Sequence, residues 1–285
     1  MGSISSYCEK KWLDHALKVA VFTTPGDVYL ALSTTDPDDS EGNITEPVGN
    51  GYAREAITFG TPAASRTIAN TVAIAFDQAS GNWGTLTHWG IFDSLTNGEM
   101  LAHGSLDNEK TIVSGNTATV AIGEVTITVN SGAVGTYLAN EMLDHTFANA
   151  TFTPPTNIFA GLSIGNPGDT GSGVSEPPDE DSIGSSASAY ERCTVNTWNA
   201  AVDGSDDYSY STNDGQFGWS SDSFAEGEAP GSNWSLVGYV FLTDVDWATS
   251  PLNHILFYTA IDTPQIPGVG DTVKFADGAL KLRLR

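Results

Sequence analysis

The sequence has few cysteines, few basic residues and no long hydrophobic run. Its 285 residues include only two cysteines, Cys8 and Cys193, which is too few for a disulfide framework and favours folding in a reducing compartment. No apolar stretch approaches the roughly 18 residues of a membrane span, and the N-terminal segment lacks the apolar core of a signal peptide. We therefore expect no membrane partner, and we expect both cysteines to be thiols.

Basic residues are scarce relative to acidic ones. The chain has 11 Lys and Arg against 35 Asp and Glu, which gives a net charge of −24. Nucleic acids and anionic membranes bind proteins through clustered Lys and Arg, so neither is expected as a partner. The acidic excess grows along the chain, because residues 1–130 carry a net charge of −9 and residues 131–285 carry −15.

What the sequence does contain is an internal repeat. Leu13-Asp14-His15 recurs 130 residues later as Leu143-Asp144-His145, and this offset holds without a gap as far as Pro47 and Pro177. Near the end, residues 115–129 align with residues 270–284 at an offset of 155. The repeat predicts two tandem modules, residues 1–130 and residues 133–285. The extra residues of the second module lie mainly at 178–189 and 199–233, and their polar, acidic composition predicts exposed loops or added hairpins.

Each module shows the pattern of a short amphipathic helix followed by short β-prone runs. Ser5 or Ser6 can cap the first helix and Thr136 the second. The chain has 30 Gly and 13 Pro, which favours short strands joined by turns. Helices and strands do not alternate, so a parallel α/β sheet is not expected. These patterns predict a mainly β chain of two tandem antiparallel β-sandwich or jelly-roll-like domains, each opening with a short α-helix.

No motif of catalytic or cofactor chemistry occurs: there is no G-x-S-x-G, no CxxC metal pair, no H-E-x-x-H and no Gly-rich phosphate loop. We therefore predict no catalytic, cofactor-binding or metal-binding residues and no enzymatic activity. In each repeated Asp-His pair the two side chains point about 100° apart on a helix, so they are expected to be surface or sheet-capping groups. Residues 36–41 could bind calcium through carboxylates, but an acidic turn fits better because the second module loses most of this charge.

For tryptophan, the sequence leaves open whether the side chains contact a partner protein or pack in the core. Trp83 and Trp234 occupy equivalent positions in the two modules, which indicates packing. Three others have no counterpart in the first module, and partner contact and core packing are the alternatives for them. Because aromatic anchors dominate many interfaces, the candidate protein-contact residues are Trp89, Trp198, Trp219 and Trp247.

Several strings of the repeat resemble a family found in tailed-phage genomes and commonly labelled phage tail-fibre or virion structural protein. They are Leu143-Asp144-His145 and residues 29–37, 49–54, 83–93 and 114–117. The first module matches over its whole length. The second matches at both ends and lacks the string found at 88–92. The family's members look like single modules of about half this length, so the resemblance implies a tandem duplication.

The resemblance implies a non-enzymatic virion structural protein that binds other virion proteins, such as major capsid or tail proteins, and needs no cofactor. A compact acidic double sandwich without collagen-like or coiled-coil stretches leads us to expect a capsid-surface decoration (cement) protein. A tail or tail-fibre component, including a carbohydrate-binding adhesin, is the alternative, and a glycoside hydrolase is a third class with little support. We expect the protein on the virion surface, assembled in the host cytoplasm, as a homo-oligomer or a symmetric array.

Overall fold

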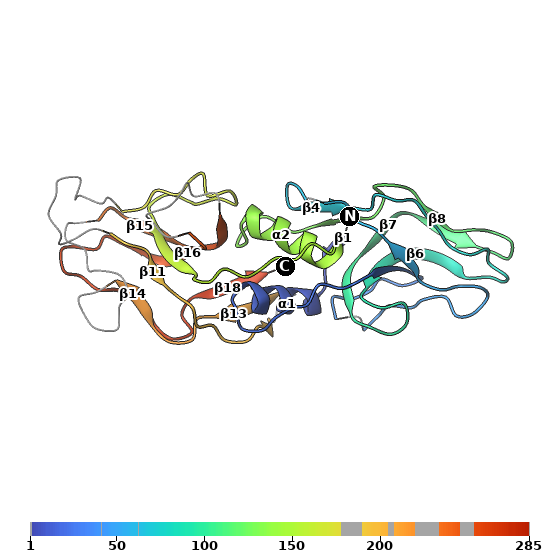
Figure 1. The fold of residues 1–285 in the computed structure, drawn as a ribbon, viewed down its shortest axis with the longest axis horizontal. Helices are drawn as coiled ribbons and strands as arrows, with labels where there is room; N and C mark the ends of the chain where they lie inside the picture. Colours follow the sequence, from blue (N-terminus) through green and yellow to red (C-terminus); the bar gives the residue numbers. More distant parts are fainter. Residues whose placement is uncertain are drawn as a thin grey trace.

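The computed structural model describes residues 2–40, 42–61, 63–177, 190–204, 208–219, 234–245 and 254–284. Two β-rich bodies lie end to end with two helices between them, and both chain ends lie near the middle (Figure 1). One body is formed from residues 2–130 and the other from residues 133–284. We call these segments the first copy and the second copy. The chain is mainly β, as predicted.

Each copy opens with a helix, α1 (Ser6–Ala16) in the first and α2 (Thr136–Phe147) in the second. Ser5 caps α1 as predicted, because its hydroxyl accepts a hydrogen bond from a backbone N–H of the first turn at 3.2 Å. Gly135 stands at the cap position of α2, so the prediction that Thr136 caps this helix is wrong by one residue. Among the described residues, no helix is both long and apolar enough to cross a membrane.

The first copy is built on one seven-stranded sheet. Its strands follow the order β3 (Glu55–Ile57), β2 (Val28–Ser33), β6 (Gly84–Phe92), β7 (Met100–Ile112), β1 (Gly2–Ile4), β9 (Thr126–Thr128) and β4 (Thr67–Ala69). The N-terminal strand β1 is antiparallel to β7 and parallel to β9, and so joins the two. Two short strands, β5 (Ile74–Ala75) and β8 (Thr119–Val120), pair separately.

The second copy divides the equivalent strands among smaller sheets. One contains, in order, β11 (Cys193–Thr194), β10 (Phe159–Ser163), β15 (Val237–Thr243) and β16 (Ile255–Gln265). Another contains β12 (Val202–Asp203), β13 (Ser209–Thr212) and β18 (Lys281–Leu284), and a third pairs β14 (Phe217–Trp219) with β17 (Val273–Phe275). The segment equivalent to β1 forms only a bridge between Val134 and Phe257, so β16 and β18 stay in separate sheets.

An aromatic cluster has the same arrangement in both copies. Tyr52 stacks on Phe76 with ring centroids 6.1 Å apart and planes 11° apart. Tyr190 stacks on Trp219 at 6.1 Å and 17°. The third ring meets the tyrosine edge-on in each copy, Trp83 at 5.3 Å and Trp234 at 5.4 Å. Trp219 therefore occupies the place of Phe76.

A buried asparagine ties strands together in the same way in each copy. The side chains of Asn70 and Asn213 each donate to two backbone carbonyls and accept one backbone N–H. Each asparagine also forms a backbone bridge with an aromatic residue, Asn70 with Phe59 and Asn213 with Trp198. Trp198 therefore occupies the place of Phe59.

Residues 208–219 of the second insertion belong to the core. They supply β13 and β14 and the buried side chains of Ser209, Ser211, Asn213, Phe217 and Trp219. The prediction of exposed loops or added hairpins is wrong for this part, because β13 and β14 take the places of β4 and β5 of the first copy. Residues 199–204 are exposed or half-buried, and β12 pairs with β13, which fits an added hairpin. Residues 178–189 and 220–233 lie outside the described residues.

The two cysteines lie in different copies. Cys8 lies in α1 and Cys193 in β11, both side chains are buried, and no disulfide joins them, as predicted. Burial raises the pKa of the Cys8 thiol well above its ordinary value, so this thiol stays protonated.

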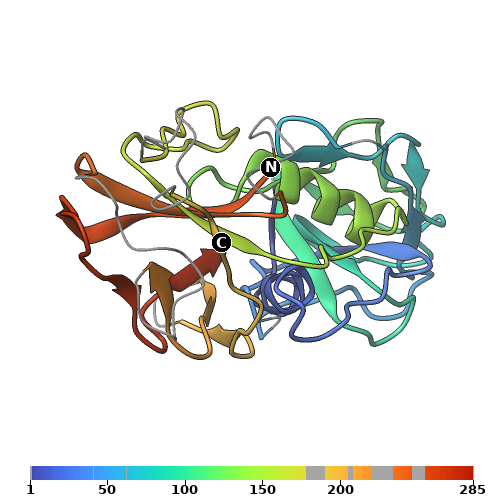
Figure 2. The same cartoon turned by 60° about the vertical axis from the view of Figure 1, so that its left-hand side comes forward.

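Each helix packs against a sheet of the other copy. α1 contacts β13 of the second copy, and α2 contacts β4 of the first. The rotated view in Figure 2 also places both helices near the middle of the molecule, beside the strands of both bodies. The helices are therefore the elements that join the copies.

Candidate functional site

The two repeated histidines meet where the copies join. The rings of His15 and His145 stack with centroids 4.7 Å apart and planes 26° apart. Their residues are only 3% and 2% exposed. They were expected to be surface or sheet-capping groups, and the surface alternative is wrong, because the face of each helix that carries the histidine is covered by the other copy.

Each imidazole makes the same two hydrogen bonds. Nδ1 accepts from a backbone N–H of its own copy, for His15 from Phe22 at 3.1 Å and for His145 from Phe152 at 3.0 Å. Nε2 donates to the carbonyl of the other copy's phenylalanine, at 3.1 Å from His15 to Phe152 and 2.8 Å from His145 to Phe22. Because Nδ1 accepts, the neutral ring must carry its proton on Nε2. Burial lowers the pKa of both histidines, which favours this neutral form.

The aspartates beside these histidines also reach across to the other copy. Asp14 Oδ1 accepts a hydrogen bond from the Ala201 N–H at 2.7 Å, and Asp144 Oδ1 accepts one from the Ala63 N–H at 2.8 Å. Reciprocal contacts of this kind are those of a twofold, self-complementary interface. We call the two Asp-His pairs the clasp. The repetition of the Asp-His dipeptide was the signal in the sequence that could have indicated it.

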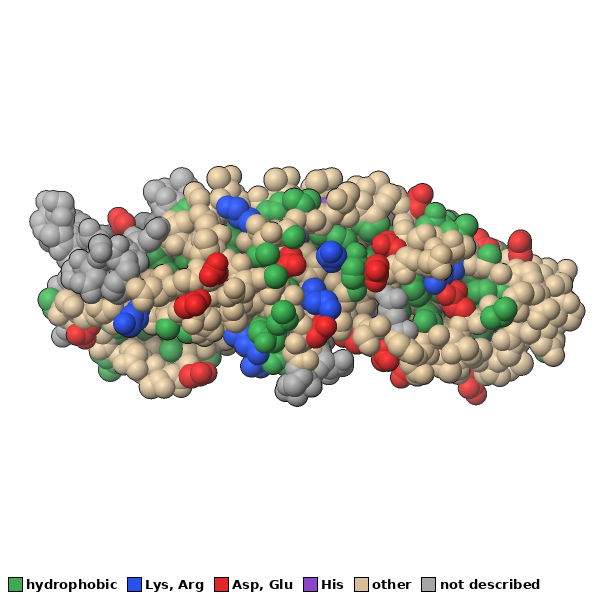
Figure 3. Space-filling model, turned by 90° about the horizontal axis from the view of Figure 1, so that it is seen from below, with side chains coloured by type: hydrophobic (Ala, Val, Ile, Leu, Met, Phe, Trp, Pro, Cys, Tyr) green, Lys and Arg blue, Asp and Glu red, His purple; other side chains and the backbone are tan. Residues whose placement is uncertain are grey.

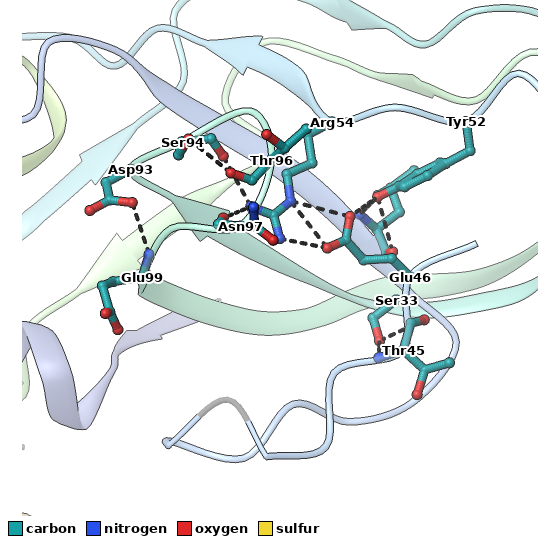
Figure 4. Close-up of polar contacts among 11 residues, drawn as sticks. Ser33, Thr45, Glu46, Tyr52, Arg54, Asp93, Ser94, Thr96, Asn97 and Glu99 are labelled. Carbon is teal, nitrogen blue, oxygen red and sulfur yellow. Dashed lines mark hydrogen bonds and ion pairs between the residues drawn. The ribbon is translucent and has the colours of Figure 1, made fainter. Parts of the chain in front are cut away.

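A second polar cluster lies between β2 and the turn after β6 in the first copy (Figure 4). Arg54 donates from Nη2 to Glu46 at 2.7 Å and from Nε to the same carboxylate at 3.1 Å. The Tyr52 hydroxyl donates to Glu46 at 2.8 Å and accepts from a backbone N–H of β2 at 2.9 Å. Arg54 Nη1 donates to two carbonyls of the turn, Ser94 at 3.0 Å and Asn97 at 2.6 Å.

The same cluster recurs in the second copy. Arg192 donates to Glu176 at 2.8 and 3.1 Å and to the Val245 carbonyl at 2.6 Å, and Tyr190 accepts from the Leu162 N–H at 2.6 Å. The side chains of Arg192 and Glu176 are only 3% and 4% exposed. Burial raises the pKa of Glu176, and its bonds to Arg192 oppose that shift. Because its groups bond to one another and to backbone, the cluster fastens a loop to the sheet and offers no base or nucleophile to a substrate.

Three of the four candidate tryptophans are core residues. Trp89, Trp198 and Trp219 are 2%, 7% and 0% exposed. Of the two alternatives, core packing therefore holds for Trp198 and Trp219, which fill the places of Phe59 and Phe76, and the burial of Trp89 likewise does not fit a surface contact. Trp247 lies outside the described residues.

The acidic segment at 36–41 forms a turn, as expected, in the part that the structure describes. Asp38 accepts hydrogen bonds from backbone groups of its own turn, at 3.1 Å from Ser40 and 2.6 Å from Gly42. Asp39 lies 3.0 Å from His103 Nε2 on β7. Within the described residues, no group of three or more His, Cys, Asp or Glu side chains is placed to hold a metal ion.

Comparison with known proteins identifies the family. The family model described as "Podophage GP4 fiber I protein gp80" matches residues 3–128 and again residues 133–283. A search of curated proteins found no match. The family model is that of a phage fibre protein, which supports a structural role in the virion. Since the two matches together span nearly the whole chain, the protein belongs to the Podophage GP4 fiber I protein gp80 family and carries the family module twice, in tandem.

Proposed function

We propose that the chain is a structural component of an external fibre of a tailed phage and acts by binding other virion proteins. The observation that carries this proposal is the match of a fibre-protein family to both copies. The elongated arrangement of two β bodies end to end supports it, because such a unit can extend a fibre (Figure 1). A fibre is favoured over the capsid-surface decoration expected from the sequence, since the family description names a fibre.

We further propose that residues 1–130 and 133–285 are two modules that form a dimer within one polypeptide. The clasp supports this idea because its contacts are reciprocal, as in an isologous dimer. A self-complementary surface is fully buried once two modules have joined. Assembly with further virion proteins would then use other faces of the chain.

Binding rather than catalysis is favoured by how the polar groups are engaged. The Glu-Tyr-Arg clusters and the clasp are occupied by hydrogen bonds within the chain. A catalytic site needs space for a reacting atom within hydrogen-bonding distance of both the nucleophile and the base. These clusters are therefore read as structural ties.

Immunogold labelling of intact particles tests the proposed location. Antibodies raised against the purified chain should decorate fibres projecting from the particle, and antibodies pre-absorbed with the chain should not. Label spread over the capsid shell would contradict a fibre component and favour capsid decoration. Absence of label from intact and from disrupted particles would contradict a virion role.

A further inference from the structure

An open groove lies in the second copy between β16 and strands β17 and β18. It has a volume of about 990 Å³, and Val240, Thr259 and Phe275 are among the residues that line it. The equivalent cavity of the first copy, which contains Trp89 and Val120, has a volume of about 320 Å³. The second copy has thus enlarged a hollow that the first copy largely fills.

One pair of exchanged residues contributes to the difference in size. Trp89 pairs with Gly104 across β6 and β7, and at the same register Val240 pairs with Thr259 across β15 and β16. A Cβ atom on Gly104 or on Gly2 of β1 would collide with the Trp89 ring, so these glycines make room for the indole. The smaller Val240 leaves the second-copy groove open.

The groove has also gained positive charge. At the offset of 155 residues, three threonines of the first copy are replaced by basic residues, Thr119 by Lys274, Thr126 by Lys281 and Thr128 by Arg283. All three basic side chains line the groove. Residues 131–285 contain only five basic residues and carry a net charge of −15. Three of these five lie in one groove, so basic residues are concentrated there although the copy as a whole is acidic.

The local charge balance is opposite in the two copies. Of the residues that the structure describes, Asp262 and Asp271 are the carboxylates that line the second-copy groove, and the three cations outnumber these two. The first-copy cavity is lined by three carboxylates and one lysine, Asp107, Glu109, Glu124 and Lys110. A surface of one sign attracts ligands of the other, and apolar walls strengthen that attraction.

Two of the groove's cations lie over tyrosine rings, which are uncharged and so do not neutralise them. Lys281 Nζ lies 3.4 Å from the centroid of Tyr210, and Arg283 Cζ lies 4.8 Å from that of Tyr208. In the described part of this carboxylate-rich chain, neither Lys281 nor Arg283 forms an ion pair. Seen from below, several Lys and Arg side chains lie near the middle of the molecule, with Asp and Glu side chains beside them (Figure 3). Tyrosine beside arginine is also a common composition of interface centres.

The geometry of the groove matches an extended polypeptide. Lys281 and Arg283 are alternate residues of β18, so they project to the same side about 6.6–7 Å apart, which is the spacing of alternate side chains in another extended chain. β16 pairs with β15 along one edge. Its other edge is paired by described residues only near Phe257 and Tyr258. The edge at Thr259 and Ala260 can therefore offer N–H and C=O groups to an added strand, before the irregularity at 261–264 interrupts the pairing of β16.

We propose that this groove binds an extended, acidic segment of a partner protein. Carboxylates at alternate positions of the segment would pair with Lys281 and Arg283, and its backbone would add to the edge of β16. This inference goes beyond the proposed fibre location and does not depend on it.

Fluorescence anisotropy with the full-length chain tests this inference. The probe is a labelled ten-residue peptide of alternating Glu and Thr, at low ionic strength. We expect Lys281→Thr/Arg283→Thr to weaken binding by at least about ten-fold, because it restores the threonines of the first copy. The control Lys11→Thr/Lys110→Thr removes the same charge elsewhere and should stay within about two-fold. A Gln-Thr probe should bind at least about ten-fold more weakly than the Glu-Thr probe.

Three outcomes would overturn the proposal. The first is no binding of the Glu-Thr probe at about 1 mM. The second is equal weakening by the groove variant and its control, which would indicate non-specific charge. The third is binding of polygalacturonate through Lys281 and Arg283 without binding of the peptide, which would make the ligand an anionic polysaccharide. Thermal unfolding checks that the variants are folded, and Lys281→Gln/Arg283→Gln, which keeps more of the aliphatic stems, replaces the threonine variant if that one is unfolded.

Discussion

The two copies, residues 2–130 and residues 133–284, share the same buried hydrogen bonds of polar side chains. They differ in how their strands are joined into sheets. In both copies a serine hydroxyl at the end of a strand accepts a backbone N–H of the following loop at 3.0 Å, Ser33 from Thr45 and Ser163 from Ser175. The Glu-Tyr-Arg clusters and the buried asparagines recur as well. By contrast, β1 joins β7 to β9 in the first copy, whereas β16 and β18 of the second copy stay in separate sheets.

This difference shows which positions of the module can change. A buried hydrogen bond needs both partners in place, since a buried polar group left without one is costly. Apolar positions can exchange volume with a neighbour, as Trp89 and Gly104 do against Val240 and Thr259. Surface threonines can become basic residues at little cost in stability. In the second copy, exchanges of apolar volume and new basic residues contribute to the opening and the positive charge of the groove.

The largest expected effect comes from the buried ion pairs. Arg192→Met should destabilise the chain by about 3–5 kcal/mol, because it leaves Glu176 buried without its cation. Arg54→Met should cost less, about 1–3 kcal/mol, because the Glu46 side chain is 23% exposed and stays partly hydrated. Urea unfolding followed by circular dichroism measures both. Equal losses would show that burial does not distinguish the two clusters.

The aromatic exchange between the copies gives a smaller effect. Trp219→Phe places the first copy's residue in the second copy's core and should cost about 1–2 kcal/mol through lost packing. Phe76→Trp, the reverse exchange, should cost about 1–3 kcal/mol through overpacking. Shifts of the urea midpoint report both. An unchanged midpoint for Trp219→Phe would contradict the buried position of Trp219.

The two histidines of the clasp should make stability fall as the pH falls. Burial lowers the pKa of His15 and His145 below the unfolded value of about 6.5, so the unfolded chain binds protons more readily. The contribution of these two histidines is complete above about pH 6.5 and is lost as the pH drops through the lowered folded pKa values. The melting temperature should therefore decrease between about pH 7.5 and 5.5.

A double variant isolates this effect from the titration of carboxyl groups. His15→Gln/His145→Gln should melt at a lower temperature at pH 7.5 and should show a weaker pH dependence. Burial raises the pKa of Asp144 and Glu141, and such groups stabilise the fold as they take up protons, which opposes the histidine effect at lower pH. His88→Gln is the matched control, because His88 lies away from the clasp beside Asp36. If His88→Gln reduces the pH dependence as much as the double variant, the clasp is not its source.

The repeat made the helices, the mainly β fold and the family predictable, because all three depend on local patterns or on strings of residues. Strand β1 was not predictable in this way. Its three residues are a strand only through pairing with β7 and β9, Gly2 with Gly104 for example, and local sequence does not specify such partners. Thr136 was predicted as a cap from its residue type alone, whereas the chain enters α2 at Gly135.

The candidate site was less predictable than the fold. Trp198 and Trp219 lacked counterparts in the sequence alignment because insertions shift the offset, and only strand register pairs them with Phe59 and Phe76. The burial of the histidines was not predicted, because each helix is covered by the other copy and the sequence of one module does not specify that contact. The groove depends on residues from β15 to β18 that meet only in the folded chain.

The tautomers of the two clasp histidines test the joined-copy account most directly. Long-range nitrogen–proton correlation NMR at pH 7.5 identifies the protonated ring nitrogen, and His15→Gln and His145→Gln assign the signals. Both rings should be neutral with the proton on Nε2, because each Nδ1 accepts a backbone N–H and each Nε2 donates to the other copy. A proton on Nδ1 of either ring, or a doubly protonated ring at that pH, would contradict a reciprocal clasp between the two copies.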